Sequence, residues 1–474
     1  MKRTFLIYTA IVFIIGACIL GILHLGQQLP HPVAASKELA TGQLATAPVA
    51  GHAAESLLDG ISHNARDPLS RLFLQMLVII TASRIAGAIF TRLGQPAVVG
   101  EMAAGILLGP SLFGLLAPDF FHFVFAADSL GSLKLLSQVG VCLFMFSVGM
   151  ELEVGQIRNK ARTAVVVSHA GIVIPYFLGV VLAYFLYQSL ARPGAGFTAF
   201  ALFMGISMSI TAFPVLARIL QERDLSKTYL GTTAITCAAV DDVTAWSILA
   251  FVVAIARSTG MMASAFNLAL VVVFIVVMVW FVRPGLPRWI GRRNLEAETP
   301  SRGVLAVLIC VVLAAALTTE IIGIHALFGA FLAGSIMPHV GNIRHKLGVR
   351  VENLSSVLLL PLFFAFTGLR TELGLLDDVH GWLICLGIIA VATAGKLGGT
   401  AVVARLTGMR WRDSLQLGAL MNTRGLMELI ALNIGYDLGI LSARIFTMLV
   451  IMALVTTMMT GPLLTLFGGK RTAR

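Results

Sequence analysis

One membrane-length stretch decides the fold: residues 228–256 read TYLGTTAITCAAVDDVTAWSILAFVVAIA. The stretch is long enough to cross a bilayer as a helix, yet two adjacent acids, Asp241 and Asp242, lie near its middle. An ionisable side chain at membrane depth is costly unless it faces protein, water or an ion. We therefore interpret the two aspartates as a functional site inside a membrane helix.

The composition of the 474-residue chain indicates an all-α polytopic membrane protein. Hydrophobic residues make up 58% of the chain and charged residues only 12%, with a mean hydropathy of +0.91. A soluble protein of this size needs more polar surface. Runs of about 20 apolar residues predict fourteen spans, at residues 5–26, 71–91, 97–117, 133–149, 163–190, 197–217, 228–256, 264–282, 303–319, 325–338, 354–369, 381–405, 413–436 and 443–467.

Basic residues set the predicted orientation. Most of the 34 lysines and arginines fall in loops on one side of the alternating topology, and the positive-inside rule makes that side cytoplasmic. If the first helix is retained, both termini are then expected in the cytoplasm, with the chain in the inner (plasma) membrane. Contact with anionic lipid headgroups is enough to account for the net charge of +11, so no nucleic-acid partner is predicted.

Four parts are predicted along the chain. Residues 1–28 form an N-terminal hydrophobic helix that is either a retained anchor or a signal peptide. Residues 29–70, rich in small and polar residues, read as an exported flexible linker. The transmembrane domain covers residues 71–468, and residues 469–474 form a short cytoplasmic tail.

The sequence contains no motif for a cofactor or for an enzyme active site. Its five cysteines lie in apolar runs without a CxxC pair, which favours a packing role over metal or redox chemistry. No phosphate loop, dinucleotide motif or nucleophile elbow stands in a matching context. An intramembrane aspartyl protease needs carboxylates on two facing helices, and no second transmembrane aspartate is available. We predict that the protein is not an enzyme.

Two predicted spans contain signals for broken helices. Residues 205–214 read GISMSITAFP, and the proline removes a backbone hydrogen bond that lipid cannot replace. Residues 421–425 read MNTRG, a polar segment at mid-depth. Discontinuous helices line the ion site in many secondary transporters, although the first segment alone is also compatible with an ordinary proline kink. The candidate residues in these segments are Thr211, Pro214, Asn422, Thr423, Arg424 and Glu428.

The two broken spans belong to an internal repeat. The three spans from 163 to 256 and the three from 381 to 467 cross in opposite directions, and aligning them places Gly205 on Gly418. This is the pattern of an inverted repeat, which puts the substrate site at the repeat interface near the midplane. We expect Thr211 and the main-chain carbonyls before Pro214 to complete ion coordination there.

Lys396 lies at the centre of span 381–405, where a cation needs an anionic partner or must lose its proton. Neighbours on a helix point about 100° apart, so Asp241 and Asp242 cannot easily share one role. One is expected to pair with Lys396, and the other to face a water-filled cavity where a proton and a small cation compete for its oxygens. The alternative for Lys396 is snorkelling to the interface.

These motifs resemble the monovalent cation:proton antiporter-2 family. The broken-helix motifs are similar to those of plant cation/proton exchangers and their bacterial relatives, whereas two acids with an intramembrane lysine resemble the electrogenic sodium/proton branch. The matching segments are GQPAVVGE (94–101), AGILLGPS (104–111), SITAFPVLARIL (209–220), AVDD (239–242) and MNTRGLMELI (421–430).

The resemblance implies a NhaA-like inverted-repeat antiporter fold with two crossed discontinuous helices, 13 core helices plus one N-terminal helix. It also implies a homodimer in which a mobile bundle moves against a dimerisation bundle. By resemblance, Asp242 is the principal carboxylate and binds a monovalent cation or a proton, while Asp241 is the partner of Lys396. Arg424 and Glu428, at i and i+4, are close enough to pair if a helix resumes after Gly425.

The predicted function is secondary antiport of Na⁺ or K⁺ against protons by alternating access, with these ions and the lipid bilayer as partners and no cofactor. A cation channel, or a proton-coupled transporter of another small ion, is the alternative.

Overall fold

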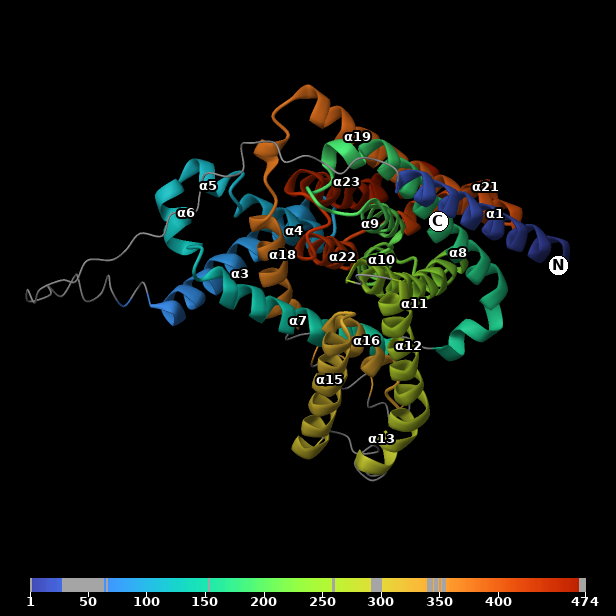
Figure 1. Ribbon diagram of the computed structural model, residues 1–474, viewed down its shortest axis with the longest axis horizontal. Coiled ribbons are helices and arrows are strands. Elements are labelled where there is room, and N and C mark those ends of the chain that lie inside the picture. The colour runs from blue at the N-terminus through green and yellow to red at the C-terminus, as the bar shows by residue number, and fades with distance from the viewer. Residues whose placement is uncertain are drawn as a thin grey trace, which may run out of the picture.

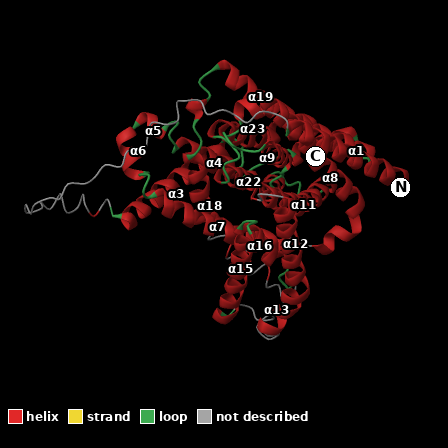
Figure 2. Cartoon of the chain, in the orientation of Figure 1, coloured by secondary structure: helices red, strands yellow, loops and turns green. Residues whose placement is uncertain are grey.

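The computed structural model describes residues 2–27, 64, 67–151, 154–257, 261–290, 301–338, 344, 348, 351 and 355–468. Within these residues the chain folds into helices (Figure 2), with one isolated bridge between Ala191 and Leu441. Most of the predicted linker 29–70 and the whole of the predicted tail 469–474 lie outside the described residues.

The helices differ widely in length. The longest are α1 (Lys2–Gly26), α3 (Pro68–Arg92), α7 (Leu130–Glu151), α8 (Val154–Leu190), α11 (Tyr229–Arg257), α12 (Met261–Val277), α15 (Arg302–Ile322) and α23 (Ala443–Gly468). The shorter ones are α4 (Ala97–Leu107), α5 (Phe113–Leu116), α6 (Pro118–Val124), α9 (Phe197–Ser209), α10 (Phe213–Glu222), α13 (Arg283–Ile290), α16 (Ala326–Ser335), α18 (Leu360–Leu369), α19 (Val379–Thr393), α20 (Gly399–Leu406), α21 (Trp411–Met421) and α22 (Leu426–Asp437). Three π turns, η1 (Met278–Val282), η3 (Ser355–Leu359) and η5 (Ala394–Gly398), and the 3₁₀ turn η4 (Leu373–Leu375) complete the described elements.

Ten segments of the described chain are long and apolar enough to cross a bilayer, fewer than the fourteen spans expected. In two expected spans, 97–117 and 325–338, the longest helices are α4 with 11 residues and α16 with 10, about half the length that a crossing helix needs. Gly109 and Pro110, which favour a turn, follow the end of α4 within this otherwise apolar run. The expected span 413–436 is divided between two shorter helices, α21 and α22. For α1, the side chains are described only over Ile14–Gly26, and that part is a short apolar helix.

The helices form two groups (Figure 1). In the first, α8 packs against α9, α11 and α20, α21 packs against α20 and α23, and α22 packs against α9 and α23. We call helices α8 to α11 and α19 to α23 the repeat bundle, because they contain both predicted repeats. In the second group, α4 packs against α3 and α18, and α7 packs against α16 and α18. Helices α12 and α15 pack against each other and extend from the molecule with α13.

Polar side chains fill the centre of the repeat bundle. Arg424 is the largest fully buried side chain, and Lys396, Asp241 and Glu428 are also 0% exposed. Charged residues are almost never fully buried unless they are paired. The burial of these four side chains therefore has to be explained by the contacts that they make.

Candidate functional site

Both predicted breaks are present. Helix α9 ends at Ser209 and α10 begins at Phe213. Pro214 lies in the first turn of α10, where its missing N–H would have no partner within the helix in any case. In the second repeat, α21 ends at Met421 and α22 begins at Leu426. The expectation of two discontinuous helices is therefore correct, and a simple proline kink does not describe the first.

The two breaks lie against each other and share hydrogen bonds. Thr211 Oγ1 donates to the carbonyl of Met421 over 2.9 Å, and the backbone N–H of Ala212 donates to the carbonyl of Thr423 over 2.9 Å. Backbone groups at membrane depth must find such partners inside the protein. Each repeat thus satisfies part of the interrupted backbone of the other.

Gly425 makes the second break possible. Its φ of +153° lies in a region that side-chain-bearing residues rarely adopt. A Cβ atom at this position would also lie 3.1 Å from Cγ2 of Val215 on α10. The glycine therefore permits both the backbone turn into α22 and the close approach of the two broken helices.

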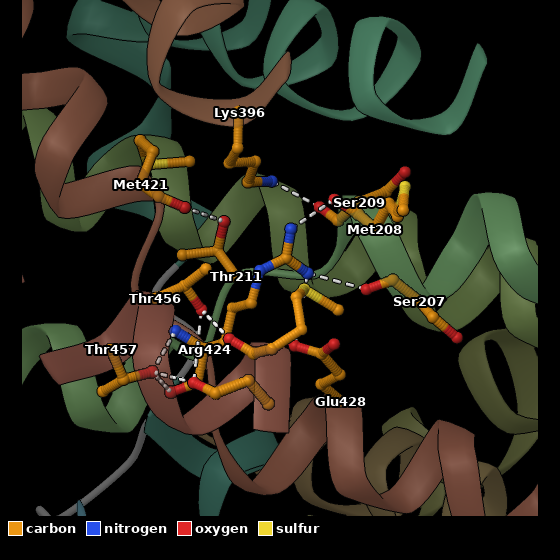
Figure 3. A network of polar contacts seen from close by, with 12 residues as sticks. Ser207, Met208, Ser209, Thr211, Lys396, Met421, Arg424, Glu428, Thr456 and Thr457 are labelled. Atoms are coloured by element: carbon orange, nitrogen blue, oxygen red, sulfur yellow. Dashed lines mark hydrogen bonds and ion pairs between the residues drawn. The ribbon is translucent and has the colours of Figure 1, made fainter. Parts of the chain in front are cut away.

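Two basic side chains cover the end of α9 (Figure 3). Arg424 Nη1 donates to the carbonyl of Ser207 over 2.6 Å and Nη2 to the carbonyl of Met208 over 2.7 Å, while Lys396 Nζ donates to the carbonyl of Ser209. The last carbonyls of a helix lack partners within it and carry partial negative charge. Three of the carbonyls expected to coordinate an ion are thus engaged by basic groups here, and their role in ion coordination stays a prediction.

Asp241 and Lys396 form a buried ion pair between the repeats. Lys396 Nζ lies 3.0 Å from Asp241 Oδ2, and both side chains are 0% exposed. Lys396 belongs to the π turn η5 rather than to a regular helix, and such turns are frequent at functional sites. The pairing agrees with the arrangement that the family resemblance implies, and it leaves no role for snorkelling in this structure.

Asp242 faces a different neighbourhood. It is 1% exposed and lines a cavity of about 10 Å³, roughly the space that one water molecule needs. The cavity lies between the first break, α11 and α22, and its other lining residues are Ile210, Ala245, Trp246, Leu249 and Met427. The two adjacent acids thus have separate surroundings, as expected from the turn of the helix between them.

Arg424 and Glu428 form a second fully buried ion pair, with Arg424 Nη1 3.2 Å from Glu428 Oε2. Threonines of α23 hold the same segment. Thr457 Oγ1 accepts from the backbone N–H of Arg424 and donates to its carbonyl, both over 2.9 Å, and Thr423 and Thr460 bring their hydroxyls to 3.2 Å. Sequence reasoning missed these threonines, although residues 456–460 read TTMMT in an apolar span, and such hydroxyls often bond across membrane helices.

Asn422 is the remaining polar residue of the second break. Its side chain is 0% exposed, and neither amide atom has a hydrogen-bond partner among the described residues. Buried polar groups normally have a partner. The Asn422 amide oxygen is therefore a candidate ion ligand. All of the predicted site residues lie at the two breaks or on α11 and η5, which pack against them.

Comparison with known proteins gives this geometry a context. Residues 78–468 match the family model described as "Sodium/hydrogen exchanger, transmembrane". The chain is 44% identical over 393 residues to the Na(+)/H(+) antiporter NhaS4 of Synechocystis sp., covering 83% of this chain and 96% of that protein. It is 40% identical over 396 residues to Cation/H(+) antiporter 17 of Arabidopsis thaliana, covering 83% of this chain and 48% of the plant protein, so it spans about half the length of that relative.

A solved structure shares the fold. The sodium proton antiporter MjNhaP1 from Methanocaldococcus jannaschii at pH 8 aligns with a TM-score of 0.58 and 14% identity, over 83% of this chain and 96% of that one. At this identity the likeness concerns the fold alone. It supports the expectation of an all-helical antiporter architecture, and the family match confirms the resemblance inferred from the motifs.

Proposed function

Because the chain belongs to the sodium/hydrogen exchanger family, and is therefore a multi-pass membrane transporter rather than an enzyme, we propose that it exchanges a monovalent cation for protons by alternating access. Asp242 binds the cation and the proton in turn. The names of the two relatives, one a sodium/proton and the other a cation/proton antiporter, support this function. Na⁺ is the first cation to test, and K⁺ is the other candidate.

The position of Asp242 carries the proposal. A buried carboxylate can be neutralised by a proton or by a small cation. Since either one neutralises the single charge, the two compete for the same oxygens. The cavity is also lined by Ile210 and Met427, which belong to the two broken helices. Binding of an ion at Asp242 is therefore expected to change the packing where the two repeats meet.

The other two acids of the proposed site are held in fully buried ion pairs. Asp241 is paired with Lys396 and Glu428 with Arg424, and breaking such a buried pair is strongly unfavourable. The same contacts join the breaks to η5 and α22, so we expect the repeat bundle to move as one body. It moves against the group containing α3, α4, α7, α16 and α18, which also carries the contacts of a homodimer.

The setting proposed for this exchange is the inner (plasma) membrane, with both chain termini in the cytoplasm if the first helix is retained. The distribution of basic residues supports that orientation.

Transport in proteoliposomes tests the proposal. Purified protein is reconstituted with an internal proton-sensitive dye and exposed to Na⁺, K⁺, Li⁺ or Rb⁺. We expect proton movement that saturates with cation concentration and reverses when the pH gradient is reversed. A channel would instead pass cations without a requirement for counter-moving protons.

Asp242→Asn is the decisive variant. It removes the exchangeable charge and nearly preserves the shape, so cation-driven proton movement should vanish while the protein remains folded by size-exclusion chromatography. Asp128→Asn, at an acid whose side chain is 77% exposed, is the matched control and should retain exchange. Normal exchange by Asp242→Asn would contradict the assignment of Asp242 as the ion-binding residue.

A further inference from the structure

One face of α22 connects the Asp242 cavity with a second pocket. Met427 lines the cavity at Asp242, and Ile430, Ile434 and Asp437 line a pocket of about 30 Å³ near the other end of the helix. Residues at these intervals of three and four lie on one side of a helix. A continuous strip of α22 therefore leads from the candidate ion site towards the side that is predicted to be outside.

The second pocket lies between the two helix groups. Its polar lining comes from Ser137 and Gln138 on α7, His325 before α16, and Asn433 and Asp437 on α22. Its volume is enough for two or three water molecules at roughly 10–15 Å³ each. On the side nearer Met427, apolar residues of α7, α16 and α18 close the pocket, namely Val141, Leu327 and Phe363.

Two ion pairs hold Asp437, one of the residues that line this pocket. Asp437 Oδ2 lies 3.1 Å from Lys134 Nζ on α7, and Asp437 Oδ1 lies 2.7 Å from Arg370 Nη2 at the end of α18. Arg370 Nη1 also donates to Asn433 Oδ1 over 3.0 Å, and its guanidinium lies 4.2 Å from the centre of the Phe366 ring. We call Lys134, Arg370 and Asp437 the outer latch.

The outer latch joins elements that the proposed movement must separate. Asp437 belongs to the repeat bundle, whereas Lys134 and Arg370 belong to the other group. A second outer ion pair also leaves the repeat bundle, since Arg257 at the end of α11 lies 4.0 Å from Glu320 on α15. Arg71 on α3 and Asp128 just before α7, 2.9 Å apart, instead form a pair within one group. Side chains of the latch are 16–35% exposed, so water can solvate each charge when the contacts break.

We propose that the pocket is the outer access route for the cation to Asp242, and that the outer latch holds this route shut in the conformation described. The inference rests on the proposed function. When the latch opens, the Asp437 carboxylate loses both basic partners and faces the route as an acceptor for a monovalent cation. The apolar residues beyond it then separate as α22 moves away from α7 and α18.

Accessibility of a cysteine in the pocket tests the latch without requiring transport. Ser137→Cys is introduced into full-length protein whose five native cysteines are replaced by alanine. The probe is a membrane-impermeant, trimethylammonium-bearing thiol reagent added outside oriented vesicles. With Asp437→Asn, the modification rate should rise about tenfold, the change expected when two partly exposed ion pairs are lost. Lys134→Gln and Arg370→Gln each remove one pair and should give smaller increases.

Asp128→Asn is the matched control, because it removes an outer ion pair that lies within one helix group. Its modification rate should equal that of the parent. An unchanged rate in Asp437→Asn, or an equal rise in Asp128→Asn, would overturn the latch. Size-exclusion profiles and modification under denaturing conditions establish that each variant is folded and carries one reactive thiol.

The two proposals fail separately. Exchange that persists in Asp242→Asn contradicts the proposed ion site, whatever the accessibility results are. Loss of exchange in Asp242→Asn together with an unchanged thiol rate in Asp437→Asn contradicts only the outer latch.

Discussion

The two ends of α22 hold ion pairs of opposite character. At its start, the Arg424 and Glu428 side chains lie 3.2 Å apart and are both 0% exposed. At its end, Asp437 is 30% exposed and contacts Arg370 and Lys134 at 2.7 and 3.1 Å. Removing one partner of a buried pair costs about 3–5 kcal/mol, whereas exposed pairs contribute about 0.2–1 kcal/mol. One helix thus combines a fixed contact at one end with a reversible contact at the other.

The largest effect should come from Arg424→Ala. The substitution leaves Glu428 buried without its cation and frees two carbonyls at the end of α9, so the free energy of unfolding should fall by about 3–5 kcal/mol. Arg370→Ala removes a partner of Asp437 at the other end of α22, together with the hydrogen bond to Asn433 and the contact with the Phe366 ring. It should cost less, about 1–2 kcal/mol, because water can solvate the Asp437 carboxylate that is left. Thermal unfolding in detergent measures both, and equal losses would remove the distinction between the two ends.

The same variants test the ion site. If Arg424→Ala and Glu428→Ala each left cation affinity and exchange rate unchanged, both residues would be structural and would leave the proposed site. Isothermal titration with Na⁺ and K⁺, alongside the exchange assay, provides these two values.

Lys396→Gln tests whether the buried pair of Lys396 and Asp241 breaks during transport. If Lys396 pairs with Asp241 in the empty site and releases a proton when a cation binds, each cycle moves two protons against one monovalent cation. A membrane potential then contributes about 2.3 kcal/mol per net charge per 100 mV. Exchange should respond to an imposed voltage, and Lys396→Gln should show slower exchange without that response. Voltage-insensitive exchange by the unmodified protein would refute this coupling.

The smallest effect should be at Lys134. Lys134→Gln should change the free energy of unfolding by less than about 1 kcal/mol, and the change should disappear in 1 M choline chloride, where the screening length is about 3 Å. The loss in Arg424→Ala should persist in that salt because solvent does not reach the pair. A salt-resistant loss in Lys134→Gln would show that the outer end of α22 is as fixed as the inner end.

Sequence reasoning found the parts of the site that have a local signal. A plain membrane helix does not explain the two acids in residues 228–256, the lysine in an apolar span, or the glycine and proline at the breaks. Each of these signals can be read from a single segment of the sequence. The short lengths of α4 and α16 had a signal that the count of apolar residues does not weigh, because Gly109 and Pro110 follow α4 and Pro338 follows α16. Hydrophobicity alone does not fix where a helix ends.

Contacts between distant segments were harder to predict. The pairing of Lys396 with one particular acid depends on the π turn at η5, and the engagement of α9 carbonyls by Arg424 depends on how the breaks face each other. The partners Lys134 and Asp437 sit in different helix groups, and each alone resembles an ordinary interfacial charge. Such contacts follow from tertiary packing, which a single sequence does not display.

The hydrogen bonds between the two breaks also constrain how the protein is made. The bond from Thr211 Oγ1 to Met421 joins residues separated by 210 positions, so the first interrupted helix enters the membrane long before its partner has been synthesised. Until then its exposed backbone must be satisfied by water or by the insertion machinery, since lipid cannot do so. Non-local closure of this kind is slow. Biogenesis should therefore be limited by the arrival of the second repeat, and nascent chains that end before residue 411 should remain protease-sensitive around residues 209–213.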